Sequence, residues 1–187
     1  MALVAGAAVV GVSVAAAQAG GAVLYGDTFV LSGSVEDGGA GRVVVVLARP
    51  HGRNSFAEVR RVRTIGGGRW RYSARPRIRT VYRARVGRLL SAPVAVDVEP
   101  RIVLGGSGGR FTARVRAARS LAGRFVVLQR RTGGPWMNVR RLVLDKRSST
   151  RFAHTRVGTQ IRLLMPRSQA GPGYVAARSA VITLSRR

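Results

Sequence analysis

The sequence has 187 residues, of which 46% are apolar, and this fraction excludes a disordered polar chain. It contains no cysteine, which excludes disulfides, thiolate metal sites and a cysteine nucleophile. The 33 basic and 7 acidic residues give a formal charge of +26, which predicts salt-sensitive adhesion to polyanions. Every basic residue except Lys146 is an arginine. Either bidentate recognition of phosphate and carboxylate by guanidinium groups or GC-rich coding accounts for this preference.

The first 21 residues are predicted to be a secretory signal. Residues 2–17 are uncharged and almost wholly apolar, and Ala17-Gln18-Ala19 has the small-x-small pattern of a signal-peptidase site. We therefore expect cleavage after Ala19. A signal normally begins with lysine or arginine, however, and the first basic residue here is Arg42, so an uncleaved anchor is the alternative.

After this segment, the sequence predicts β-strands separated by glycine-rich turns. In residues 28–35, 69–74 and 94–98, two kinds of side chain alternate with a period of two, one suited to a core and the other to water. This alternation places one face of a strand in a core and the other in water. Turns are predicted at the glycine clusters that punctuate these runs. No stretch beyond the N-terminal segment sustains the 3.6-residue apolar period of a helix.

The chain also contains two copies of one pattern, about 80 residues apart. An apolar strand that begins Gly-Arg occurs at 41–49 and again at 123–131. Four further pairs follow in the same order: Phe56 and Trp136, 59–62 and 139–142, Trp70 and Phe152, and 91–94 and 179–182. This order predicts an all-β chain of two tandem immunoglobulin-like or fibronectin-III-like β-sandwich domains, over residues 22–99 and 100–187.

The second copy reads Gly-Arg, an apolar run, a Gln-Arg-Arg triplet at 129–131, a glycine turn, Trp136, a valine and then an aromatic on a hairpin strand. In this order it resembles the immunoglobulin-like repeats of secreted and cell-wall-associated actinobacterial proteins, over residues 24–185. The resemblance implies spacer or adhesive modules without catalytic activity. Tyr82 matches the penultimate strand of such repeats, whereas the corresponding run 161–164 of the second copy has no tyrosine.

Catalysis and metal binding need titratable groups that converge, and the sequence offers few. The histidines, His51 and His154, fall in different copies and have no ligand spacing. Asp27, Asp97 and Glu99 could meet at one end of the first domain, where ion pairing with arginine is favoured over a calcium site. No nucleophile motif or phosphate-binding glycine loop occurs. We therefore expect no enzyme activity, no metal and no cofactor.

The basic residues are distributed unevenly along the chain. Residues 1–100 have a net charge of +8 and residues 101–187 have a net charge of +18. A polyanion-binding patch is predicted where six arginines of the second copy would share one sheet face: Arg114, Arg116, Arg130, Arg131, Arg140 and Arg141. The alternative is a solvated face on which arginine prevents edge pairing between sheets.

These features favour an exported structural or adhesive protein of the cell envelope or extracellular space. The alternative is a basic module that binds anionic envelope polymers, such as wall polymer, acidic polysaccharide or lipid head groups. Other surface proteins are further candidate partners. Nucleic-acid binding, with Trp136 or Tyr174 stacking on bases, ranks third because an export signal places the protein away from the genome. Contact with a membrane is expected only through an uncleaved N-terminal segment.

Overall fold

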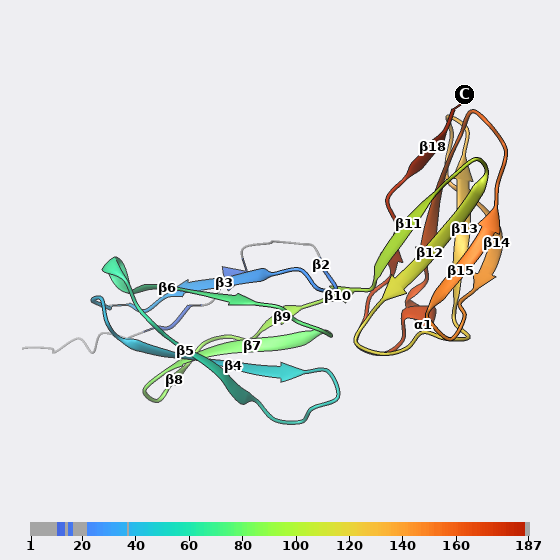
Figure 1. Cartoon of the computed structure of the whole chain (residues 1–187). Helices are drawn as coiled ribbons and strands as arrows, with labels where there is room; N and C mark the ends of the chain where they lie inside the picture. The colour runs from blue at the N-terminus through green and yellow to red at the C-terminus, as the bar shows by residue number, and fades with distance from the viewer. Residues whose placement is uncertain (1–10, 14, 17–21, 37, 186–187) are drawn as a thin grey trace, which may run out of the picture. The chain divides into compact units, whose positions relative to one another are not determined.

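The computed structural model describes residues 11–13, 15–16, 22–36 and 38–185, and its regular structure is almost entirely β-strand (Figure 1). The strands form several sheets in which the pairing is mostly antiparallel. Contacts along the chain divide it into two compact units, each of which is described by itself. The first comprises the described residues up to 16 with Thr28–Ala74 and Thr80–Val96, and the second comprises Ala22–Asp27, Arg75–Arg79 and the described residues from Asp97 onward.

The first unit contains a three-stranded and a five-stranded sheet. The smaller sheet has the order β1-β3-β6. In the larger sheet β4 lies between β5 and β7, and both β8 and β9 pair with β7. The elements are β1 Ala15–Ala16, β3 Phe29–Ser34, β4 Val43–Pro50, β5 Ala57–Arg63, the 3-10 turn η1 Gly66–Gly68, β6 Arg69–Ala74, β7 Thr80–Val86, β8 Leu89–Leu90 and β9 Val94–Val96.

The second unit has the same two kinds of sheet. The smaller sheet has the order β11-β12-β15, and in the larger β13 lies between β14 and β16, with β17 and β18 both pairing with β16. The short strands β2 and β10 pair in parallel. The elements are β2 Val23–Leu24, β10 Val98–Glu99, β11 Arg101–Ser107, β12 Arg110–Arg116, β13 Phe125–Arg131, β14 Met137–Val143, β15 Ser149–Ala153, β16 Thr159–Met165, α1 Arg167–Ala170, β17 Ala177–Arg178 and β18 Ile182–Leu184.

Alternating burial explains why these segments are strands. In β16 the residues that alternate from Thr159 to Met165 are buried, and those between them are half-buried. β12 alternates in the same way, with arginine or threonine at each exposed position and Phe111, Ala113 and Val115 in the core. Since successive side chains of a strand point to opposite faces, one face of each sheet builds the core and the other faces water.

The two units repeat strand order and register as well as sequence. Strands β3 to β7 of the first unit correspond in order and pairing to β12 to β16 of the second. A β-bulge interrupts both central hairpins at one equivalent place, between Val46 and Leu47 and between Leu128 and Gln129. Ser91 and Ser179, matched in the sequence, make one hydrogen bond twice: each Oγ accepts from a backbone N–H of the neighbouring strand at 2.9 Å.

The large core aromatics follow the repeat less closely than the sequence predicts. Trp70 and Phe152 are both buried, as expected. The prediction that they hold equivalent positions is wrong by two residues: β6 and β15 begin at equivalent positions, so Trp70 corresponds to Thr150. Trp70 lies opposite Gly33, and a Cβ at Gly33 would come within 2.8 Å of the indole. In the second unit Phe152 stacks instead on Phe111, with ring centroids 5.5 Å apart.

The first described residues form the edge of the smaller sheet in the first unit. β1 pairs with β3, Val12 bridges to Val35, and the backbone N–H of Ser13 donates to Ser34 O at 2.9 Å. β11 has this place in the second unit. Part of the predicted signal segment therefore pairs as a strand, while the predicted cleavage site at 17–19 lies outside the described residues. In the described part of the chain, no helix is long and apolar enough to cross a membrane.

The grouping by contacts differs from the predicted domain limits of 22–99 and 100–187. Ala22–Asp27 belongs to the second unit because β2 pairs with β10, and the N–H of Tyr25 donates to Glu99 O at 2.8 Å. Tyr25 packs against the core cluster of that unit.

Replacement of Trp70 by alanine is expected to destabilise the first unit by about 3–5 kcal/mol, because it removes a buried aromatic side chain and leaves a cavity. The unfolding of this unit in urea can be followed by far-UV circular dichroism, with Trp136 fluorescence as an internal report on the second unit. Val59→Ala is the control, since Val59 is 44% exposed and its truncation should change stability by less than about 0.5 kcal/mol. An unchanged urea midpoint for Trp70→Ala would contradict the packing described above.

Deletion of residues 1–19 is expected to destabilise the first unit by about 1–3 kcal/mol, because the N–H and C=O groups of the β3 edge lose their partners. The chain has two tryptophans, one in each unit, so a Trp136→Phe background makes Trp70 fluorescence report on the first unit alone. Coincident urea transitions of the full-length and shortened chains would show that β1 does not stabilise the sheet.

Candidate polyanion-binding surface

The six arginines predicted to share one face are divided between the two sheets of the second unit. Arg114 and Arg116 are exposed on the outer face of the smaller sheet, where Arg101 lies opposite Arg116. The other four lie on β13 and β14 of the larger sheet. The expectation of a single patch is therefore wrong, because strand order places β12 and β13 in different sheets.

The remaining four arginines lie on two different faces of the larger sheet, because successive side chains of a strand point to opposite sides. We call the side to which a residue points its parity. Arg130 pairs in register with Ile161, which is fully buried, so Arg130 has the parity of the core side at the end of its strand. Arg140 pairs with the buried Leu128 and donates to Ala153 O at 2.9 Å. Arg131 and Arg141 have the opposite parity and lie on the outer face of the sheet. The structure thus brings together only two of the six predicted residues on this face.

On this outer face, arginine side chains stack on aromatic rings. The guanidinium carbons of Arg131 and Arg162 lie 4.9 Å and 4.1 Å from the ring centroid of Trp136. The guanidinium carbon of Arg141 lies 4.8 Å from the ring centroid of Phe125. Cation–π attraction of this kind holds a long cationic side chain in place without neutralising it. We call Arg131, Arg141 and Arg162 the stacked arginine row.

Hydrogen bonds between side chains fix the row further. Arg162 Nε donates to Gln129 Oε1 at 2.8 Å, and Gln129 Nε2 donates to Asn138 Oδ1 at 2.9 Å. Arg131 Nε donates to Gln160 Oε1 at 2.5 Å. Burial, together with neighbouring arginines, lowers the pKa of Arg162, but a guanidinium remains charged at neutral pH. Both contacts use Nε, so the terminal nitrogens of Arg131 and Arg162 remain as donors for another group.

The first unit has a related arrangement at equivalent positions. Arg49 and Arg83 flank the ring of Phe56, with guanidinium carbons 4.9 Å and 5.3 Å from its centroid. Here an acid completes the face, since Arg61 donates to both carboxylate oxygens of Glu58, at 2.7 Å and 3.2 Å. This hydrogen bonding to Arg61 lowers the pKa of Glu58.

Sequence reasoning missed Arg162, Phe125, Gln129 and Asn138, which complete the surface. One signal was present: Arg83 and Arg162 both precede an apolar residue in the penultimate strand of their copy. The pairing of Arg83 with Leu47 and of Arg162 with Gln129 shows that the two arginines are equivalent. Gln129 is itself 7% exposed, so it forms the floor beneath the charged groups.

Three of the four acids in the second unit contact arginine side chains or backbone N–H groups, and burial raises the pKa of the fourth, Glu99. Arg101 pairs with Asp27, and Arg79 Nε lies 3.0 Å from Asp97 Oδ1. Asp145 accepts hydrogen bonds from the backbone N–H groups of Ser149 and Arg147. Both bonds lower the pKa of Asp145, and the bond from Ser149 has the larger effect. Over the described residues, no three or more histidine, cysteine, aspartate or glutamate side chains converge as metal ligands.

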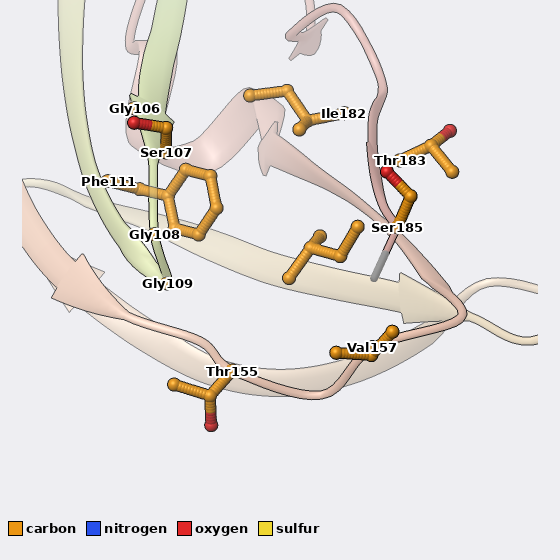
Figure 2. A pocket seen from close by; sticks show the side chains of 11 residues that line it. Gly106, Ser107, Gly108, Gly109, Phe111, Thr155, Val157, Ile182, Thr183 and Ser185 are labelled. Atoms are coloured by element: carbon orange, nitrogen blue, oxygen red, sulfur yellow. The ribbon is translucent and has the colours of Figure 1, made fainter. Parts of the chain in front are cut away.

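Two of the hollows in the second unit lie outside the stacked arginine row, and their linings differ. A hollow of about 420 Å³ opens between the glycine turn 106–109 and the strand β18, with Phe111 beside it, and no titratable side chain lines it (Figure 2). A shallow depression of about 690 Å³ lies over the smaller sheet and is lined by Arg114, Arg147 and Arg151, with Asp145 among them. The depression over the smaller sheet therefore contains a carboxylate of its own, that of Asp145.

The two aromatics proposed for stacking on bases are already engaged. Tyr174 is 3% exposed; its hydroxyl accepts from the Ala118 N–H at 2.9 Å and donates to Arg77 O at 2.8 Å. Trp136 is flanked by Arg131 and Arg162. Tyr174 is therefore a core residue, and Trp136 serves as a support for guanidinium groups.

Comparison with protein families and with curated proteins yields no match. Among solved structures, the chain is similar to the crystal structure of the Pseudomonas aeruginosa CupB2 chaperone, at 12% sequence identity, with 91% of this chain and 100% of that chain covered and a TM-score of 0.28. A TM-score this low supports no conclusion about function.

The stability of the second unit should fall as the pH drops below about 6.5, the ordinary pKa of histidine. Burial, with the nearby charges of Arg130, Arg140 and Arg156, lowers the pKa of His154. In this pH window the unfolded chain therefore binds more protons than the folded one, so acidification favours unfolding. Urea midpoints followed by Trp136 fluorescence at pH 7.5 and pH 5.5 measure the effect. His154→Gln should make the difference between the two midpoints smaller, and an equal difference in both proteins would contradict the assignment.

Proposed function

We propose that this protein is an exported, non-enzymatic structural or adhesive protein of the cell envelope or extracellular space. It presents two immunoglobulin-like sandwiches, and it acts through their surfaces. The observation that supports this proposal best is the repeated outer sheet face, on which arginine side chains stack on an aromatic ring in each unit. Such a face offers cationic donors in a fixed arrangement.

The sheet order supports the finer assignment of the fold. In each unit the smaller sheet has three strands, and in the larger sheet one strand of a hairpin pairs with a further strand on its other side. This order is that of fibronectin-III-like sandwiches. Domains of this architecture commonly serve as spacers and surface modules, and their functions depend on the residues of their faces and loops.

A second candidate function is the binding of anionic envelope polymers, and the stacked arginine row favours it. The charge of +18 on residues 101–187 attracts any polyanion, and preordered guanidinium groups lose little conformational entropy when they bind one. Wall polymer, acidic polysaccharide and lipid head groups all present such anions at an envelope. Export itself is tested by mass spectrometry of the native protein, since a mature start at Gly20 is expected and an intact Met1 would contradict a cleaved signal.

Retention of the full chain on isolated envelope fractions, titrated with salt, tests adhesion directly. Replacement of Arg131 and Arg141 by serine should lower the slope of log affinity against log salt by about 1.4–1.8, because each lost contact releases fewer counterions. Replacement of Arg130 and Arg140 removes the same charge from positions of core-side parity, so it should lower the slope less. Retention that does not depend on salt, or on which pair is removed, would favour a passive structural module.

A further inference from the structure

We propose that the outer face of β13, β14 and β16 binds a carboxylate-bearing polysaccharide, whose acid groups take the place that Glu58 has in the first unit. This inference rests on the proposed adhesive function and names its surface and its ligand. The same face has a glutamate bound to an arginine in the first unit and an asparagine at the equivalent position in the second.

The two faces correspond residue by residue. The bulged hairpins place Glu58 opposite Leu47 and Asn138 opposite Gln129, so Asn138 is the equivalent of Glu58. In the same register Arg61 corresponds to Arg141, three residues later in each strand. The first unit therefore has a glutamate three residues before an arginine that it binds, and the second unit has the neutral asparagine at the same spacing.

The missing carboxylate leaves the second face without a counter-ion. In the described part of the chain, Arg131, Arg141 and Arg162 form no ion pair with any acid, whereas Arg61 pairs with Glu58. Asn138 accepts from Gln129 and so turns toward the network beneath the row. Repulsion between guanidinium groups on this face is therefore not offset within the described residues, and an external anion would relieve it.

The ligand class follows from the group that occupies the first face. Glu58 presents both carboxylate oxygens to Arg61, which is the bidentate geometry that guanidinium favours. A polymer with one carboxylate on each sugar would supply such groups repeatedly to Arg141, Arg162 and Arg131, which lie on the neighbouring strands β14, β16 and β13. The rings of Phe125 and Trp136 hold these side chains in place before binding, which lowers the entropic cost.

The basic outer face of the smaller sheet is not equivalent. Asp145 lies in the depression with Arg147 and Arg151, and the charges of both arginines lower the pKa of this carboxyl, after its backbone hydrogen bonds. Asp27 pairs with Arg101 at the far strand of the same sheet. That face therefore contains its own carboxylates, and it serves as the control surface.

The test exchanges the two residues between the units of the full chain. Asn138→Glu should pair with Arg141 and weaken binding to polygalacturonate at about 150 mM salt by roughly tenfold, the effect of losing one charge-assisted pair. Thr112→Glu adds the same charge on the control surface, where Thr112 is exposed beside Arg151, and should change affinity less than about twofold. The double variant Glu58→Asn/Asn138→Glu has the composition of the natural chain and should recover at least about threefold over Asn138→Glu alone. Circular dichroism and urea midpoints confirm that each variant is folded.

Each outcome decides one point. Equal weakening by Asn138→Glu and Thr112→Glu would show that net charge alone governs binding, and it would overturn the assigned face. Tighter binding of polyphosphate or single-stranded DNA than of polygalacturonate, with the same response to Asn138→Glu, would overturn the carboxylate class. No binding of the natural chain to any of these polymers or to envelope fractions would instead contradict the adhesive function itself. Neutral dextran, which offers no anion, should not bind.

Discussion

Period-two burial along the strands is the constraint on which the other features depend. In β12 one set of alternate side chains lies in the core and the other is exposed, and in β16 the second set is half-buried. A chain with 33 basic and 7 acidic residues must keep this charge on outer strand positions, at strand ends and in turns, since an unpaired charge in a core is costly. The sheets therefore acquire arginine-rich outer faces as a direct result of how their cores are built.

Placing so much charge of one sign on a sheet requires a means of holding it there. The two units use stacking of guanidinium groups on an aromatic ring, around Phe56 and around Trp136. They differ in what completes the face: Glu58 neutralises part of the first, while Asn138 leaves the second cationic. The same strand order therefore bears one face on which an acid pairs with an arginine and one on which the equivalent residue is neutral.

The core shows how the same topology accommodates different side chains. Trp70 occupies space that Gly33 leaves free, whereas the second unit fills its core with a stacked pair, Phe111 and Phe152. The edge of the first unit shows a further dependence on tertiary contacts. Residues of an apolar N-terminal segment pair with β3 at the place that β11 has in the second unit, and the composition of that segment is equally typical of a signal.

The sequence alone determined that the chain is all-β, that one pattern occurs twice, and that Ser91 and Ser179 are equivalent, because period-two patterning and repeated local order are properties of neighbouring residues. It did not determine which arginines meet. Arg114 and Arg131 lie in different sheets, and Arg130 and Arg131 have opposite parity, since strand order and register depend on pairings between distant segments. The hairpin of β13 and β14 follows from the local pattern, but only the tertiary structure brought Arg162 to Gln129 and Asn138, because β16 pairs with β13 from a distant part of the chain.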